Sequence, residues 1–513
     1  MATATSTAPM PPTDPSTMST DADRKVGGAH KQRAFTAVLW ASFEQIGAHG
    51  LGTIFMLVFA RFLSSAEFGI FAAALLMMTF AQQLAILGLN TTIVQRHELS
   101  PRTLSTAFWM SMSLTVPLGF LMVVFAPQVA ALFGNSEIAR YVPLLVIGLV
   151  FNTASALLTG VLRRELNMKA LARRTLAANG ISGLIATPLI IYGFGVWGLI
   201  TQVVLGSALT FALSVALLGW PIRLAFDRIA AREMLRFSAP ICGADMLTQY
   251  TREGPKFFVG IFLGVEALGL FSMAMRILNL LLQVVGVTLS KVSMPVLSRV
   301  NRETPDRFAE IFLRLSTLAG AFILPAFALT AVLREPLVRI LLGARWLEIT
   351  PLVIFLCGAG ILTTLNYLNS SSMVSRGRPG ARLTFSALRA TVGTLLFVLL
   401  TPLGLIWAAA AFLLRGVIVE PVPLVFVLRL LGIRPADYLR RLAGPVLATL
   451  AMIVVAEVVL VLLDDQVTAL LRLALPAAAG IAVYGLALFL LSNALVTEFK
   501  GLVATLRRKR QGA

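Results

Sequence analysis

A group of charged side chains interrupts a long apolar stretch near the middle of the chain, in the segment ADMLTQYTREGPKFFVG. Asp245, Gln249, Arg252 and Lys256 recur at intervals of four, three and four residues, which places them on one face of a helix. Ionisable residues inside a membrane are costly and need a protein-interior or water-filled face. The two cations suit an anionic group such as a phosphate; the alternative is internal ion pairing, Asp245–Arg252 or Glu253–Lys256, that only fixes packing.

The dipeptide Gly254–Pro255 lies among these charges. Proline has no backbone N–H and disrupts the hydrogen-bond ladder of a helix. We therefore expect a break or kink beside Arg252 and Lys256, near the middle of the span.

Two other apolar stretches carry polar stripes at helical spacing. One contains Arg276, Asn279 and Gln283, and the first apolar stretch of the chain contains Gln45 and His49. Hydrogen bonding between neighbouring helices is the better explanation of any single Gln or Ser. Taken together, stripes on several helices favour a shared central cavity.

The composition identifies the elements that must position these residues. Of 513 residues, 58% are hydrophobic and 13% are charged, whereas a soluble protein carries about 25% charged residues. Apolar runs of about twenty residues, each long enough to cross a bilayer as a helix, recur about fourteen times. The chain is therefore an all-α polytopic membrane protein.

The net charge of +19 does not indicate a nucleic-acid partner. With the N-terminus inside, most Lys and Arg residues fall in the inner loops, which is the bias that keeps cationic loops cytoplasmic. An even number of spans then places both termini in the cytoplasm. The basic C-terminal tail is expected to meet anionic membrane lipids.

The chain contains an internal repeat. FARFLSSAEFGIF at 59–71 returns as VGIFLGVEALGLF at 259–271, and GFGVWGLI at 193–200 resembles PLGLIWAA at 402–409. Two parallel copies of a six-helix unit predict two lobes that face each other across a cleft, which is a transporter architecture. The expected organisation is a disordered cytoplasmic tail (1–33), an N-terminal lobe (34–219), a cytoplasmic linker (220–236), a C-terminal lobe (237–430), two further helices (431–495) and a basic cytoplasmic tail (496–513).

Carboxylates in or beside the stripes are candidates for ion coupling. They are Glu44, Asp245 and Glu253, and Glu44 and His49 are suited to proton coupling. A lone intramembrane histidine is as readily a hydrogen-bonded structural residue. Arg389 and Arg415 either line a groove of the second lobe or extend to an interface. The longest outer loop, 334–349, is expected to form a short amphipathic helix lying at the interface.

Other motifs carry little chemistry. The GxGxxG pattern at 193–198 follows no strand and indicates a turn, and no Walker sequence or zinc-ligand spacing is present. The two cysteines, Cys242 and Cys357, suit packing rather than a disulfide or metal. The sequence therefore predicts no cofactor and no metal site.

Several segments resemble a known family. FARFLSSAEFGIFAAALLMMTFAQQLAILGLNTTIVQR (59–96), PKFFVGIFLGVEALGLFSMAMRILNL (255–280) and REPLVRILLGARW (334–346) are similar to Wzx-like lipid-linked oligosaccharide flippases, as is 294–329. The resemblance implies the multidrug/oligosaccharidyl-lipid/polysaccharide exporter fold, with two six-helix lobes in a V around a central cavity. It implies a polyprenyl-diphosphate-linked glycan as cargo, and polysaccharide polymerase and co-polymerase proteins as partners. It also implies a bacterial inner-membrane location.

The resemblance and the residues together predict alternating access without chemical transformation of the cargo, so the protein is not expected to be an enzyme. Cavity cations would offset the diphosphate charge while the lobes rock. One alternative is a cation-coupled multidrug exporter, which would need carboxylates facing a cationic drug. The other is a membrane glycan polymerase or glycosyltransferase, which would need a large outer loop with catalytic Arg or Asp residues.

Overall fold

The computed structural model describes most of the chain as helix. The residues that it describes are 40, 43–89 (except 46 and 49), 93, 100–165, 167–219, 222–283, 288–463 and 467–491. The terminal tails expected at 1–33 and 496–513 lie outside the described residues. No strand occurs in the described ranges, as the long apolar runs predict.

The helices are bounded as follows: Phe43–Ala60, α2 (Ser65–Ile86), α4 (Pro101–Leu132), α5 (Glu137–Arg164), α6 (Met168–Ile191), α7 (Val196–Leu218), α8 (Arg228–Leu281), α9 (Thr288–Glu303), α10 (Phe308–Val332), α11 (Arg334–Leu341), α12 (Thr350–Ser375), α13 (Pro379–Leu400), α14 (Leu405–Val419), α15 (Pro421–Leu430), α16 (Pro435–Leu462) and α17 (Ala469–Leu491). Short 3-10 turns connect several of them. They are Pro305–Arg307, Ala344–Ile349 and Thr401–Leu403.

Thirteen helices in the described part of the chain are long and apolar enough to cross a membrane, against the expected number of about fourteen. The difference arises at α8, which counts as one helix although Gly264 interrupts its helical geometry (φ 83°, ψ −178°). A positive φ of this size is a glycine conformation. Gly264 therefore divides α8 into a first arm, 228–263, and a second arm, 265–281.

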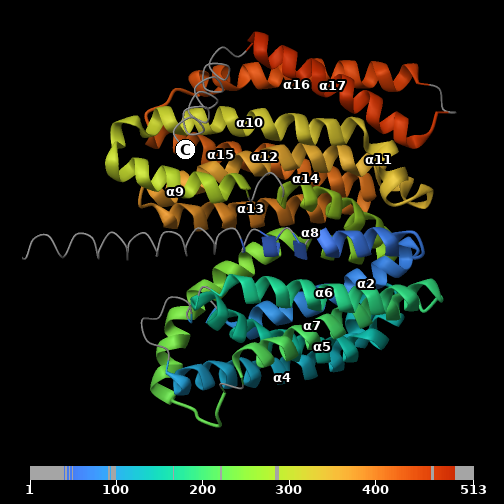
Figure 1. The fold of residues 1–513 in the computed structure, drawn as a ribbon, viewed down its shortest axis with the longest axis vertical. Helices are drawn as coiled ribbons and strands as arrows, with labels where there is room; N and C mark the ends of the chain where they lie inside the picture. Colours follow the sequence, from blue (N-terminus) through green and yellow to red (C-terminus); the bar gives the residue numbers. More distant parts are fainter. Residues whose placement is uncertain are drawn as a thin grey trace, which may run out of the picture.

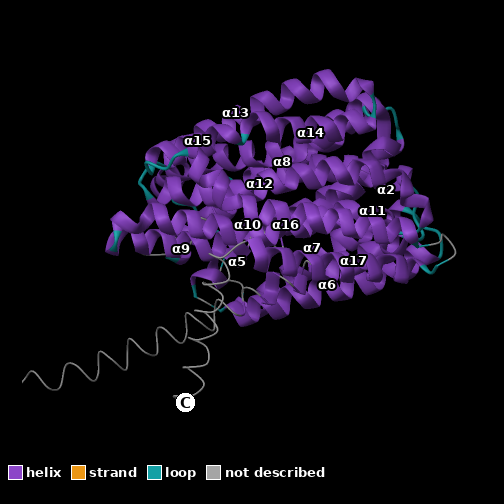
Figure 2. Cartoon of the chain, turned by 90° about the horizontal axis from the view of Figure 1, so that it is seen from above, coloured by secondary structure: helices purple, strands orange, loops and turns teal. Residues whose placement is uncertain are grey.

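The helices form two bundles that lie side by side. Figure 1 shows α2 and α4–α7 in the lower bundle and α10 and α12–α17 in the upper one, with α8 between them. Helices α16 and α17 lie at the outer edge of the upper bundle, packed on each other and, through α16, on α10. Seen along the other direction, in Figure 2, the whole molecule is helical with short connections. The two-lobe fold with two additional C-terminal helices is confirmed.

The bundles meet where α2 crosses the second arm of α8. A Cβ atom on Gly69 would overlap the carbonyl oxygen of Val265, and one on Gly269 would overlap that of Ser65. These glycines occupy equivalent positions in the two copies of the repeat. Ser64, the N-cap of α2, is likewise equivalent to Gly264, where the second arm begins. Both copies therefore turn at the same position and place a glycine at the crossing.

Additional hydrogen bonds join the two bundles at the same end of the molecule. The indole Nε1 of Trp346 donates to the Ala60 carbonyl at 2.7 Å, and Arg61 Nη2 donates to the Ile340 carbonyl at 2.8 Å. The hydroxyl of Ser65 donates to Glu266 Oε1 at 3.1 Å. We call this group of contacts the closed end.

The segment 334–349 was expected to lie at the membrane interface as an amphipathic helix. It is helical in α11, but Trp346 is only 1% exposed and packs edge-on against Phe68 with 5.3 Å between ring centroids. A large aromatic side chain gains more from burial between two bundles than from an interface. The segment thus joins the bundles at the closed end.

Helix α8 begins inside the segment expected to link the lobes. Asp227 caps it by accepting from the backbone N–H of Ile229 and Ala230. Just before it, the backbone N–H of Arg223 donates to Ser105 on α4, and Trp109 Nε1 donates to the Arg223 carbonyl. The first arm thus begins in contact with the first bundle and crosses to the second (Figure 1).

Candidate functional site

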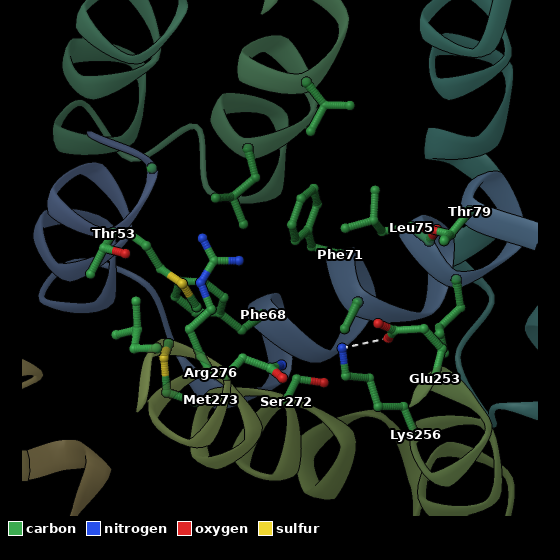
Figure 3. A pocket seen from close by; sticks show the side chains of 18 of the residues that line it. Thr53, Phe68, Phe71, Leu75, Thr79, Glu253, Lys256, Ser272, Met273 and Arg276 are labelled. Carbon is green, nitrogen blue, oxygen red and sulfur yellow. Dashed lines mark hydrogen bonds and ion pairs between the residues drawn. The ribbon is translucent and has the colours of Figure 1, made fainter. Parts of the chain in front are cut away.

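A cavity of about 640 Å³ lies between the bundles. Its walls come from the Phe43–Ala60 helix, α2, α6 and α7 on one side and from both arms of α8 and α12 on the other. Phe59 and Phe68 bound it toward the closed end. Figure 3 shows Arg276, Lys256 and Glu253 entering from α8, opposite Phe71, Leu75 and Thr79 of α2.

The first arm of α8 contributes two cations and one carboxylate to the cavity. Lys256 Nζ lies 2.7 Å from Glu253 Oε2, and both side chains are largely shielded. Arg252 Nε lies 3.7 Å from the other carboxylate oxygen, and its side chain is 66% exposed. The predicted Glu253–Lys256 pair therefore exists, but it also lines the cavity and leaves Arg252 available to a ligand.

The second arm adds the third cation. Arg276 lines the cavity together with Asn279 and Gln283, and Tyr367 of α12 lies on the same wall. The guanidinium reaches across to the first bundle, because its Nη2 lies 3.8 Å from where a Cβ on Gly52 would stand. Three cations against one carboxylate give the described lining residues a net positive charge.

The opposite wall, from α2, is mostly apolar. It presents Phe68, Phe71, Leu75 and Leu76, with Thr79 farther along. A cationic wall facing an apolar wall suits an amphiphilic anion, since charge and apolar surface can be satisfied at the same time.

Not every predicted site residue lines this cavity. Arg252, Glu253, Lys256, Arg276, Asn279 and Gln283 do. Gln45, Gln249, Glu44 and Asp245 are not among its lining residues. Glu44 instead accepts a hydrogen bond from Thr175 at 3.3 Å. His49 lies outside the described residues.

The expected helix break at Gly254–Pro255 is wrong. Helical geometry continues through both residues, and the interruption comes at Gly264 instead. Because Pro255 has no N–H, the carbonyl of Thr251, one turn earlier, loses its helical donor. Arg415 Nη1, from α14, donates to that carbonyl at 3.2 Å. A side chain distant in the sequence thus replaces the missing backbone donor.

Arg389 and Arg415 line a small pocket between the first arm of α8, α13 and α14, which agrees with the expected groove of the second lobe, and neither lines the main cavity. Arg389 makes two hydrogen bonds to Glu420, of 2.9 and 2.8 Å. Arg415 is 5% exposed and stacks over Phe412 at 4.2 Å. Arg389 thus joins α13 to the C-terminal end of α14, and Arg415 joins α14 to the first arm of α8.

We expect the cost of removing Arg415 to depend on residue 255. Arg415→Met leaves the Thr251 carbonyl buried without a donor, which costs about 1–3 kcal/mol. In a Pro255→Ala background the alanine N–H supplies that donor, so Arg415→Met should lower the melting temperature of the detergent-solubilised protein less than it does in the wild type.

Arg174→Met serves as the control for this cycle. It removes a buried guanidinium that donates to Thr159 and Ser214 within the first bundle, so its effect should not change with residue 255. An Arg415→Met effect that is equal in both backgrounds would show that this hydrogen bond does not replace the proline's missing donor.

The first bundle contributes polar residues that the sequence did not single out. Asn179 and Gln202 line the cavity, and a side pocket of about 260 Å³ continues from them. Its walls are amides, hydroxyls and glycines: Gly52, Asn152, Ser155, Asn179, Ser182, Gln202, Gly206, Ser207 and Thr210, with Val203. Such residues also mediate helix packing, so their spacing alone gives no distinct signal. Within the described ranges, no group of three or more His, Cys, Asp or Glu residues is placed to hold a metal ion.

The sequence is similar to a family of known proteins and to several of its relatives. Residues 58–351 match the family model described as polysaccharide biosynthesis protein. The chain is similar to the succinoglycan biosynthesis transport protein ExoT of Rhizobium meliloti, with 25% identity over 63% of this chain and 66% of that protein. It is also similar to the lipopolysaccharide biosynthesis protein WzxC of Escherichia coli, with 21% identity over 72% and 74% of the two chains.

A solved structure shares the fold. The lipid II flippase MurJ in an inward closed conformation superimposes with a TM-score of 0.73 at 16% identity, covering 90% of this chain and all of that one. At this identity the likeness concerns the arrangement of helices.

Proposed function

Because the chain belongs to the polysaccharide biosynthesis protein family, we propose that it is a flippase for a polyprenyl-diphosphate-linked oligosaccharide. The observation that carries the proposal is the cationic wall formed by Arg252, Lys256 and Arg276 between two bundles of a multi-pass membrane protein. A diphosphate carries two or more negative charges, and a low-dielectric surrounding strengthens their attraction to these cations.

The mechanism we propose is alternating access. The glycan and diphosphate occupy the cavity in water while the polyprenyl chain remains in the bilayer, and the bundles rock to expose the cavity to the other side. Each bond of the cargo stays intact, so the protein acts as a transporter and not as an enzyme. Polymerase and co-polymerase proteins would take up the delivered glycan.

The closed end supports a definite starting state. Its contacts at Gly69, Gly269 and Trp346 must separate before cargo can leave on that side. With the positive-inside arrangement, this end faces outward, both termini are cytoplasmic and the structure represents an inward-facing state of an inner-membrane protein.

Topology reporters check that orientation. Fusions at positions 98 and 168 should report cytoplasm, and fusions at 137 and 340 should report the outer side. Position 340 is decisive, because α11 belongs to the closed end. A cytoplasmic signal there would reverse the orientation and overturn the inward-facing assignment.

A cation-coupled drug exporter is less well supported by the cavity. Such a transporter needs carboxylates that are available to a cationic drug, and the carboxylate among the described lining residues, Glu253, is paired with Lys256 at 2.7 Å. Of the three carboxylates expected to couple ions, all within the described residues, Glu253 is the one that lines the cavity.

Reconstitution tests the function directly. Proteoliposomes containing a fluorescent undecaprenyl-diphosphate-linked sugar are treated with a membrane-impermeant oxidant that destroys exposed sugars. In protein-free vesicles about half of the label, the inner leaflet, should resist, whereas wild-type vesicles should lose nearly all of it. Protection of the inner leaflet in wild-type vesicles, with a fluorescent cationic drug crossing instead, would favour the exporter.

A further inference from the structure

We propose that the side pocket of the first bundle binds the first sugar of the cargo, a neutral pyranose such as a hexose or N-acetylhexosamine. This inference rests on the proposed flippase function and assigns the cationic wall and the side pocket to two adjacent parts of one ligand. The side pocket is lined by the residues from Gly52 to Thr210 named above.

The chemistry of the side pocket differs from that of the cationic wall. Among the described residues, its lining includes amides and hydroxyls and no ionisable side chain. On α6, which contributes to this lining, the buried Arg174 is engaged elsewhere and donates to Thr159 and Ser214, each at 2.9 Å. The described lining therefore offers a phosphate no cation inside the pocket, whereas uncharged sugar hydroxyls need only hydrogen-bonding groups.

The polar groups are oriented to serve a ligand that both donates and accepts. Ser207 and Thr210 donate their hydroxyl hydrogens to carbonyls of their own helix, at 2.8 and 2.7 Å. Their oxygens therefore remain as acceptors. The amides of Asn179 and Gln202 have no hydrogen bond to another described residue, so both their donors and acceptors are available.

The location fits the covalent structure of the cargo, in which the first sugar is attached directly to the diphosphate. Gly52, Asn179, Gln202 and Val203 line both the main cavity and the side pocket. Arg276 Nη2 stands at that junction, 3.8 Å from the Cβ position of Gly52. A diphosphate held by Arg276 would therefore place the adjoining sugar at the mouth of the side pocket.

The size of the side pocket limits what it can hold. At about 30 Å³ for each water in the liquid, 260 Å³ corresponds to roughly nine waters, which is enough for one sugar ring. The rest of the oligosaccharide must lie in the main cavity. We therefore infer that the side pocket recognises the first sugar only, and that later sugars are selected less strictly.

Binding measurements on the purified full-length protein in nanodiscs test this proposal. The ligands are undecaprenyl diphosphate and its glucosyl, galactosyl and N-acetylglucosaminyl derivatives. At least one sugar-bearing lipid should bind the wild type more tightly than the sugar-free lipid. Gln202→Leu and Asn179→Leu should each lower the ratio of the sugar-bearing to the sugar-free affinity about five- to tenfold, as loss of one hydrogen bond implies.

The matched control is Gln128→Leu, the same substitution on an exposed face of α4 away from both pockets. It should leave the sugar preference intact. Thr210→Val, which exchanges a hydroxyl for a methyl of the same shape, provides a gentler variant in case the leucine variants do not fold, with an expected loss of about two- to fivefold.

The outcomes distinguish failure of the sugar-site proposal from failure of the flippase proposal on which it rests. If the wild type binds none of the four lipids, the flippase proposal itself fails. If it binds undecaprenyl diphosphate and no sugar adds affinity, the flippase proposal stands and the sugar site is overturned. Equal losses for sugar-free and sugar-bearing lipids in the variants would likewise make the side pocket a structural feature.

Discussion

Replacing Arg276 with alanine should abolish flipping in proteoliposomes while the protein still folds and inserts. Arg276 projects from the second arm of α8 into the junction between the bundles, so its removal takes away the cation that we place nearest the diphosphate. The attraction between a guanidinium and a diphosphate within the membrane-spanning region is worth several kcal/mol, so its loss corresponds to a loss of flipping of about a hundredfold or more.

Arg276→Lys should retain part of the activity, because the charge survives although the planar guanidinium is lost. Arg252→Ala should act in the same direction. Arg102→Ala, at an exposed position at the start of α4, is the control for loss of a positive charge. Normal flipping by both Arg276→Ala and Arg252→Ala would mean that the diphosphate is bound elsewhere.

Replacing Gly69 or Gly269 with alanine should disrupt the closed end. The added methyl would overlap a backbone carbonyl oxygen, of Val265 or Ser65 respectively, and backbone atoms cannot move aside as a flexible side chain can. Overpacking of this kind costs about 1–3 kcal/mol. We expect a lower melting temperature and a flipping rate reduced by more than tenfold, because the bundles can no longer close against each other at this end.

Gly243→Ala provides the comparison within α8. A Cβ at Gly243 meets no atom within 4 Å, and alanine is favoured over glycine in a helix. This variant should therefore match or exceed the wild type in melting temperature. If Gly69→Ala matches Gly243→Ala in melting temperature and flipping rate, the close contact between α2 and α8 is not needed in the transport cycle, and our description of the closed end is wrong.

Hydropathy and charge were sufficient to predict the bundles and the cationic wall. Charged residues within membrane-spanning segments are rare, so Arg252, Lys256 and Arg276 stand out in the sequence. The helical stripe that begins at Asp245 was less informative. Because the first arm of α8 crosses from one bundle to the other (Figure 1), successive turns of one helical face meet different neighbours.

Two features depend on tertiary contacts that local sequence cannot reveal. Pro255 predicts a kink when its helix is considered alone, and only the folded chain brings Arg415 to the Thr251 carbonyl. The side pocket is formed by Asn, Gln, Ser and Thr residues on α5, α6 and α7. Their spacing within each helix is equally compatible with helix packing, so their convergence required the arrangement of all three helices.

The contact between Gly69 and Gly269 has the form of an interface in a two-fold dimer. In such an interface one surface patch faces its own copy, so each residue meets its equivalent. Here the same position of each repeat supplies the glycine, and each glycine fits beneath a carbonyl of the other copy's first turn. A separate six-helix chain with this patch would be complementary to itself, so the fused protein retains the geometry of a homodimer. Substitution of either glycine by a larger residue would therefore require a compensating change in the other copy, because each glycine packs against the backbone of the other copy.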